Sequence, residues 1–328
     1  MNQTDLKLTN TNYKAPKKEL WIGGETESET GVKYWYQHIR FCNLTMPDPQ
    51  TSKPKISLLG YACDEGVRRN RGRIGASLGP DTIRMELAHL AFQKEGQSVT
   101  DYGNIICESG AMENCQSILA DLTEKNLELG ILSIVLGGGH DLAYGHFTGV
   151  YKALEKKGFS KVGIFNFDAH FDLRTVNKEP NSGTPFNQIL TEHPNDVDYF
   201  ALGIQKTANN SELFAIAKEK KVKYLFNYSC YMSNIDVIKC KITLFLEQVD
   251  ALYVTVDLDG FSSAYAPGVS APSPLGFEPD FVYKILTHLL ESKKLVAFDI
   301  AELNPLFDQD GCTAKLAARI VDTVIQKI

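Results

Sequence analysis

The chain has 328 residues, of which 43% are hydrophobic and 23% are charged, and its formal net charge is −6. These proportions are typical of soluble globular proteins, so they exclude disordered, fibrous and disulfide-framework classes. The lysines and arginines are scattered except in the loop 68–73, which argues against a nucleic-acid partner. That arginine-rich loop suits a small anionic ligand, although a solvated basic loop is an equally good interpretation.

The cysteines and the N-terminal residues indicate the cellular compartment in which we expect the protein. The seven cysteines are odd in number and include no CxxC pair, so we expect reduced thiols in a cytoplasm, without disulfides or a zinc–cysteine site. The stretch 1–20 is polar and lacks the apolar core of a signal peptide. No later stretch approaches the roughly 18 uninterrupted apolar residues of a membrane span. We therefore expect a cytoplasmic protein with no membrane partner.

Predicted strands and helices alternate along the chain. Residues 1–50 look irregular, and we expect them to wrap the body or an adjacent subunit, with disorder of the first fifteen or so equally compatible. Short apolar runs that end in polar or glycine residues predict buried strands at 56–59, 131–136, 162–167, 251–256 and 295–300. Helical patterns lie between them, for example at 117–129, 147–157, 211–220 and 280–290. This spacing predicts one α/β domain over 51–328, with a parallel sheet covered by helices on both faces.

Residues of metal-ligand type follow three of these predicted strands. They are His140, Asp168, His170, Asp172, Asp257 and Asp259. The first comes after three glycines that allow the chain to turn tightly beyond strand 131–136. The next three follow strand 162–167, where the period of two places them on one side while the chain stays extended, and the last two follow strand 251–256 in the same way. Parallel strands end at one edge of a sheet, where open α/β folds bind ligands, so we expect all six to meet.

Four carboxylates in one place repel each other strongly unless cations neutralise them. Two histidines with carboxylates and no thiolate favour a borderline-hard divalent ion such as manganese over structural zinc, with cobalt or nickel able to substitute in vitro. Six ligands with bridging carboxylates suit two ions about 3.5 to 4 Å apart. Each motif alone is common, but together they predict a dinuclear centre. We expect the other histidines to be surface or packing residues and assign them no role, with His146 the best candidate for a residue that hydrogen-bonds a ligand.

The order of a GG-x-H turn, a DAHxD strand end and a DxD strand end resembles the ureohydrolase, or arginase-like, family. The elements 75–80 (GASLGP) and 299–305 (DIAELNP) extend this resemblance over nearly the whole chain. The resemblance implies a three-layer α/β/α sandwich with a central parallel sheet, assembled as a trimer or hexamer, and two manganese ions per subunit. One ion would be held by His140, Asp168, Asp172 and Asp257, and the other by Asp168, His170, Asp257 and Asp259.

The resemblance also implies catalytic roles. Glu302 stands where the family places a carboxylate beside the guanidinium or amidinium group of the substrate. We expect Asp172 to pass a proton from the attacking water to the departing amine. Asp299 lies on the opposite face of its strand from Glu302, so we expect it to be a buried structural partner.

Departures from the arginase pattern point to one branch of the family. Where arginases carry an asparagine and a histidine, this chain has Arg174 and Phe186. The arginine suits an extra carboxylate on the substrate, and the phenylalanine removes a group credited with proton shuttling. The segments 20–24, 64–73 and 182–186 closely resemble formimidoylglutamases, which implies hydrolysis of N-formimidoyl-L-glutamate to L-glutamate and formamide. The residues expected to bind this substrate, with the choice among the arginines open, are Arg174, Arg69, Arg71, Asn209, Asn210 and Ser182.

Two other functions fit the same motifs. An agmatinase or another guanidino-acid hydrolase would keep the metal centre and release urea, but Arg174 would repel the ammonium group of agmatine. A non-catalytic binding protein of the same fold would have little reason to keep six convergent polar ligands. The sequence gives little support for nucleotide binding through residues 137–141, because the Lys-Ser/Thr ending of a phosphate-binding loop is absent.

Overall fold

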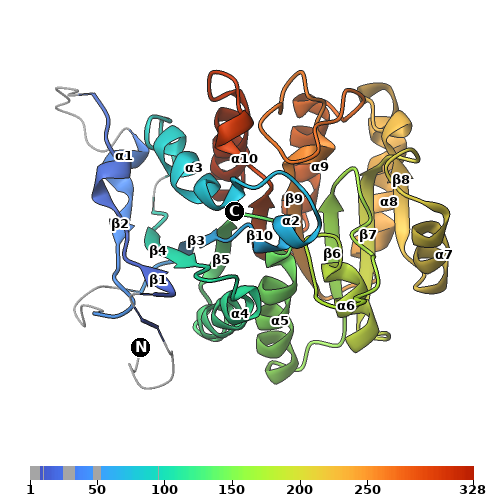
Figure 1. Cartoon of the computed structure of the whole chain (residues 1–328), viewed down its shortest axis with the longest axis horizontal. Coiled ribbons are helices and arrows are strands. Elements are labelled where there is room, and N and C mark those ends of the chain that lie inside the picture. The colour runs from blue at the N-terminus through green and yellow to red at the C-terminus, as the bar shows by residue number, and fades with distance from the viewer. Residues whose placement is uncertain (1–7, 10, 25–33, 47–52, 95) are drawn as a thin grey trace.

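A large sheet forms the centre of the protein in its computed structural model, which describes residues 8–9, 11–24, 34–46, 53–94 and 96–328. Within these residues the sheet has ten strands in the order β1-β4-β3-β5-β10-β9-β6-β7-β8, with β2 paired to β4 (Figure 1). β1 runs antiparallel to β4, and the other pairings are parallel. The strands are β1 Tyr13–Lys14, β2 Arg40–Phe41, β3 Ile56–Ala62, β4 Val99–Ile106, β5 Leu132–Leu136, β6 Val162–Phe167, β7 Val197–Ile204, β8 Lys223–Phe226, β9 Ala251–Asp257 and β10 Leu295–Ala301.

Helices connect the strands and cover the sheet. The α-helices are α1 Trp35–His38, α2 Glu65–Arg69, α3 Gly79–Ala88, α4 Met112–Glu128, α5 Leu142–Lys156, α6 Pro185–Glu192, α7 Ser211–Glu219, α8 Ile235–Leu246, α9 Pro279–Glu291 and α10 Cys312–Lys327. The short 3-10 helices are η1 Lys18–Leu20, η2 Ala76–Leu78, η3 Asn227–Ser229, η4 Met232–Asn234, η5 Leu258–Gly260 and η6 Pro305–Phe307. No helix in the described part of the chain is long and apolar enough to cross a membrane.

The helices lie in two layers, one on each face of the sheet (Figure 1). α3, α8, α9 and α10 share an apolar cluster with one face, while α4, α5, α6 and α7 pack on the other. Successive residues of β9 show that one strand contributes to both faces: Val254 lies in the first cluster and Tyr253 in the second. Because both faces are covered, the strand is largely apolar, with Thr255 and the terminal Asp257 as its polar residues. The expected three-layer α/β/α sandwich is confirmed.

The predicted strands correspond to β3, β5, β6, β9 and β10, and the predicted helices to α4, α5, α7 and α9. β4, β7 and β8 were not predicted. In β4 the apolar run is interrupted by the buried Asp101, whose carboxylate accepts hydrogen bonds from Arg84 (2.8 and 2.9 Å) and from Trp21 (3.0 Å). Such a buried ion pair hides a strand from a hydrophobicity pattern.

The first fifty residues add edge strands to this sheet. β1 and β2 both pair with β4, so the described parts of this segment are not wholly irregular. Trp35 is fully buried, and its indole donates to Asp322 on α10 at 2.6 Å. The rest of the expected irregular segment, residues 1–7, 10, 25–33 and 47–50, lies outside the described residues.

Four neighbouring strands bring the candidate site together. β5, β10, β9 and β6 are adjacent and parallel, and their last residues are in register: Leu136 lies beside Ile300, Ala301 beside Asp257, and Val256 beside Phe167. The segments that follow these strands therefore emerge side by side at one edge of the sheet. This is the edge at which parallel sheets place their ligands.

Candidate metal centre

The loop after β5 carries the first ligand. Its backbone is held by hydrogen bonds from Gly137 N to the carbonyl of Ile300 at 2.7 Å and from Gly139 N to the carbonyl of Cys63 at 2.9 Å. A Cβ at Gly138 would collide with the carbonyl oxygen of Cys63, so only glycine allows this approach. The loop delivers His140, whose side chain is buried, to the edge of the sheet.

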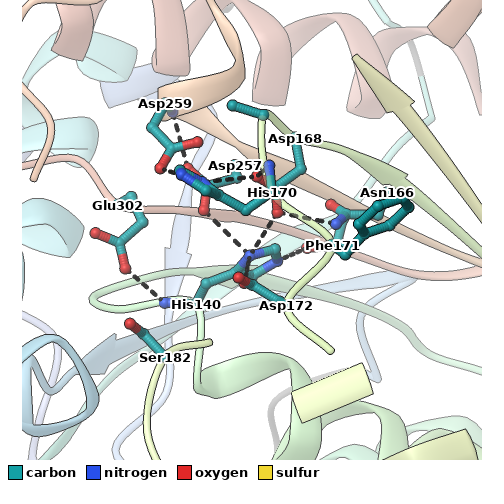
Figure 2. A network of polar contacts seen from close by, with 12 residues as sticks. His140, Asn166, Asp168, His170, Phe171, Asp172, Ser182, Asp257, Asp259 and Glu302 are labelled. Atoms are coloured by element: carbon teal, nitrogen blue, oxygen red, sulfur yellow. Dashed lines mark hydrogen bonds and ion pairs between the residues drawn. The ribbon is translucent and has the colours of Figure 1, made fainter. Parts of the chain in front are cut away.

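Asp168, His170 and Asp172 follow β6, but not as a continued strand. β6 ends at Phe167, and Asp172 has a positive φ of 48°, which turns its side chain back toward Asp168 (Figure 2). The expected convergence is present, whereas the expected extended path to Asp172 is wrong. His170 N donates to Oδ1 of Asp168 at 2.7 Å, which closes the turn.

Asp257 and Asp259 end β9 in a similarly compact way. Asp257 is the last residue of the strand, and Asp259 lies in η5. The backbone N–H of Asp259 donates to Oδ1 of Asp257 at 2.8 Å. The two carboxylates are thereby held next to each other, and both are buried.

The six side chains form two adjoining groups (Figure 2). Nδ1 of His140 lies 3.3 Å from Asp168, 3.0 Å from Asp172 and 3.1 Å from Asp257. Nδ1 of His170 lies 3.1 Å from Asp259 and 3.5 Å from Asp168. The ligand atoms within each group lie within 4.8 Å of one another, the first group being His140, Asp168, Asp172 and Asp257 and the second Asp168, His170 and Asp259.

Asp168 belongs to both groups, which suits a bridging ligand. Asp257, which the family resemblance also makes a bridge, falls only in the first group. The donor set fits divalent cations, since Nδ1 of His140 and Oδ1 of Asp259 are buried and make no hydrogen bond within the described residues. Imidazole nitrogen and carboxylate oxygen without thiolate are ligands of manganese-type ions.

The carboxylates of the two groups are buried close together, which favours the binding of positive charge. Burial and the charge of Asp259 raise the pKa of Asp257 well above its ordinary value, and burial and Asp168 raise that of Asp172 to about 6. Burial would also raise the pKa of Asp168, but the neighbouring imidazoles of His140 and His170 outweigh burial and lower the pKa. Burial disfavours protonated His140, yet the surrounding carboxylates raise its pKa well above the ordinary value. The site thus attracts cations strongly.

A cavity of about 320 Å³ opens beside these groups. It is lined by His140, His170, Asp172, Asp257 and Asp259, and also by Glu302, Arg71, Arg174, Ser182 and Asn209. Glu302 is buried, and burial followed by the charge of Asp259 raises its pKa to about 8. A larger polar hollow of about 850 Å³ shares Arg71 and Arg174 with this cavity and is lined by Asn210 as well. The cavity therefore has a carboxylate beside the ligand groups and arginines toward its mouth.

Two of the expected substrate-binding residues, Arg174 and Ser182, are linked by hydrogen bonds through Asn70. Arg174 Nη1 donates to Oδ1 of Asn70 at 2.7 Å, and Nδ2 of Asn70 donates to the hydroxyl of Ser182 at 3.0 Å. Asn70 was not singled out from the sequence. The side chain of Arg71 lines both hollows and makes no hydrogen bond or ion pair within the described residues.

Three other residues expected to bind the substrate line the two hollows but have their polar groups engaged within the protein. Arg69 uses all five guanidinium N–H groups on Glu65, Glu113 and the carbonyls of Gly110 and Pro180, so none is left for a substrate. Asn209 donates to the carbonyls of Ala169 and Gln205 and accepts from Phe171 N, which makes it a brace for the DAHxD turn. Asn210 caps the N-terminus of α7 by accepting from Leu213 N at 3.0 Å.

Comparison with known proteins agrees with this geometry. The model of the Arginase family matches residues 54–326. The chain belongs to the arginase family. It is 39% identical to a formimidoylglutamase of Clostridium tetani (97% of this chain, 96% of the relative) and 40% identical to one of Lysinibacillus sphaericus (94% and 96%). The structure of the Bacillus subtilis formimidoylglutamase superimposes with a TM-score of 0.81 at 21% identity, covering 93% of this chain and 95% of that one. That superposition shows the arginase fold.

Two further residues orient the ligands in this arginase-family chain. Thr255 lies on β9 with its hydroxyl 2.9 Å from Nε2 of His140, and Asn166 on β6 donates to Oδ2 of Asp168 at 2.9 Å. Each stands two residues before a ligand, on the same face of its strand. Sequence reasoning missed both, although a lone polar residue at that spacing in an apolar strand was a usable signal.

His146 does not support the metal ligands as expected. Its Nδ1 lies 2.6 Å from Asp299 and its Nε2 3.0 Å from the hydroxyl of Ser133, within the core. Asp299 also accepts a hydrogen bond from Tyr253 at 2.5 Å and is fully buried, which confirms its expected structural role. This network ties α5 to β9 and β10 behind the centre of the arginase fold.

Proposed function

We propose that this chain is a dinuclear manganese hydrolase that cleaves the C–N bond of N-formimidoyl-L-glutamate to yield L-glutamate and formamide. The observation that carries the proposal is the cavity, which has six ligand-type side chains and Glu302 at one end and Arg71 and Arg174 toward the other. The formimidoylglutamases that are 39% and 40% identical to it over nearly their full length support the same reaction. A structural neighbour from Trypanosoma cruzi, a formiminoglutamase, is described with Mn²⁺.

His140, Asp168, Asp172 and Asp257 would hold one manganese ion, and Asp168, His170 and Asp259 the other, with Asp257 completing it. When bound, the ions would supply positive charge that lowers the pKa of the attacking water and stabilises developing negative charge. Asp172 would accept the proton of that water and deliver it to the departing amine of glutamate.

The substrate presents an amidinium head and two carboxylates. Glu302 would pair with the amidinium and hold its carbon in line for attack, since a buried carboxylate seeks a positive partner. Arg71 and Arg174 would bind the carboxylates, and Ser182 would contribute its hydroxyl. Asn70 holds Arg174 and Ser182 in place through both ends of its amide. Water adds to the formimidoyl carbon and the bond from that carbon to the glutamate nitrogen breaks.

We further propose that the protein acts in a cytoplasm as a trimer or hexamer. None of the seven cysteines, all of which lie in the described residues, forms a disulfide, which suits a reducing compartment. The outer side of α8 exposes Val237 and Leu244 to 62% and 59%, which suits contact with another subunit. Light scattering of the purified protein would give the number of subunits.

The test is to incubate the manganese-loaded protein separately with N-formimidoyl-L-glutamate, agmatine and arginine, and to assay formamide, glutamate and urea. Formamide and glutamate from the first substrate alone, abolished by Asp257→Ala, are the expected result. Urea from agmatine or arginine would keep the metal centre but overturn the roles of Arg71 and Arg174. No turnover with manganese bound would indicate a non-catalytic binding protein.

A further inference from the structure

Three thiols that are distant in the sequence meet on the far side of the His140 loop. Cys63 directly follows β3, Cys107 directly follows β4, and Cys115 lies on α4. β3 and β4 are parallel neighbours that end in register, so their next residues emerge together. The three sulfur atoms lie within 4.8 Å of one another. The sequence spacing did not predict this cluster, because no two of these cysteines form a CxxC pair.

The thiol cluster is buried on one side and open on the other. Cys63 and Cys115 are each 1% exposed, whereas Cys107 is half-buried. The nearby thiols of Cys115 and Cys63 hold the pKa of Cys107 below its ordinary value. The same contacts with Cys107 raise the pKa of the other two thiols. The cluster therefore brings three sulfur atoms together, and Cys107 is the one that solvent can reach.

We propose that Cys63, Cys107 and Cys115 form a second metal site, for a thiophilic d¹⁰ cation such as Zn²⁺ or Cu⁺. Thiolates are soft ligands that select these ions over manganese, which prefers the carboxylates and imidazoles of the other centre. Zn²⁺ would complete a tetrahedron with water at the open side of Cys107, whereas Cu⁺ is satisfied by three thiolates. Binding releases the protons of the thiols and places positive charge among the sulfur atoms.

The surroundings of the thiol cluster favour that positive charge. Asp141, which follows His140 in the same loop, is fully buried. Oδ1 of Asp141 makes no hydrogen bond within the described residues, while Oδ2 accepts from Tyr61 at 2.7 Å. A cation bound by the thiols gives this buried carboxyl group a positive neighbour. The carbonyl of Cys63 also holds Gly139 N at 2.9 Å, so an occupied site stiffens the loop that carries His140.

This proposal does not depend on the proposed function, and its test does not use turnover. The reduced protein is loaded with Mn²⁺ and then titrated with Zn²⁺ alone or, without oxygen, with Cu⁺ alone. Bound metal is counted by native mass spectrometry, and thiol alkylation is mapped by peptide mass spectrometry. Because Zn²⁺ can also displace Mn²⁺, the same titration is run on Asp257→Ala, which weakens the carboxylate centre and leaves the thiols intact.

The expected result is one further equivalent of Zn²⁺ or Cu⁺ that protects Cys107 from alkylation in both backgrounds. Cys107→Ser should lose affinity by more than the roughly 10- to 100-fold typical of changes behind a ligand. The matched control Cys240→Ser changes an exposed thiol on α8 and should bind as the parent does. If Cys107→Ser does not fold, the alkylation of Cys107 in the parent protein, with and without the added metal, still tests whether the thiols bind it. Unprotected Cys107 at saturating metal, or equal uptake by folded Cys107→Ser, overturns the proposal.

Discussion

The backbone N–H of His140 donates a hydrogen bond of 2.9 Å to Oε1 of Glu302 (Figure 2). The backbone N–H of Glu302 in turn donates to the carbonyl of Gly138 at 2.8 Å. The loop that carries a metal ligand and the carboxylate proposed to hold the substrate are therefore one hydrogen-bonded unit. A displacement of either one is transmitted to the other.

Glu302→Gln should lower kcat/KM for N-formimidoyl-L-glutamate on the order of 100-fold. The physical reason is that removing one member of a buried, hydrogen-bonded charge pair costs about 2 to 5 kcal/mol. Steady-state kinetics with the manganese-loaded protein measures the effect, with Glu291→Gln on the surface of α9 as the control. Unchanged kcat/KM would remove Glu302 from the substrate site.

Asp168→Asn and Asp259→Asn should differ in how many manganese ions the protein holds. Asp168 belongs to both ligand groups and Asp259 only to the second. We therefore expect Asp168→Asn to weaken both sites and Asp259→Asn to weaken one. Calorimetric titration of the metal-free variants with Mn²⁺ measures the stoichiometry and affinity. The same loss in both variants would contradict the sharing of Asp168.

Thr255→Val should weaken manganese binding by about 10- to 100-fold, although Thr255 is not a ligand. The hydroxyl of Thr255 lies 2.9 Å from Nε2 of His140 and directs Nδ1 toward the carboxylates. Thr255→Ser, which restores the hydroxyl, should recover most of the affinity. A variant that binds Mn²⁺ normally while losing stability would show that Thr255 only fills the core.

Arg71→Ala and Arg69→Ala should separate substrate binding from stability. Arg71 lines the cavity, so its removal should raise KM about 10-fold or more with little effect on unfolding, because an exposed charge contributes little to stability. Removal of Arg69 leaves Glu65 paired only with the more exposed Arg68 and takes the partner of Glu113 away, so it should cost about 1 to 3 kcal/mol of unfolding free energy. Kinetics and urea unfolding of both variants are the measurements. A reversed pattern would restore Arg69 as the residue that binds the substrate.

The ion pair of Glu65 should also shape stability at acidic pH. Hydrogen bonding by Arg68 is the largest cause that lowers its pKa, burial opposes it, and Arg69 adds to the lowering. The stability that Glu65 contributes is therefore fully present above its ordinary pKa of 4.5 and is lost as the pH falls through the lower folded value. Glu65→Gln should flatten the decline of unfolding free energy between about pH 5 and pH 3, measured by urea unfolding. The exposed Glu247→Gln should leave that decline unchanged.

The residues of the candidate metal centre could be grouped from the sequence because parallel strands end at the same edge of a sheet. β5, β6 and β9 are apolar runs that stop abruptly, and the polar residues that follow them have no place in the core. In a parallel sheet such residues can only gather at one edge. His140, Asp168 and Asp257 were therefore identifiable without coordinates, and the covered sheet followed from strands that are apolar on both faces.

What only the tertiary structure decided depends on contacts between distant segments. Arg69 and Arg71 look equivalent in the sequence, yet Glu113 on α4 and the carbonyl of Pro180 occupy the guanidinium of Arg69 alone. The spacing of Cys63, Cys107 and Cys115 in the sequence matches no metal-binding motif such as a CxxC pair. They meet because β3, β4 and α4 pack together. Sequence periodicity reports which face of an element is buried. It carries no information about which partner a long, flexible or small polar side chain will find across the fold.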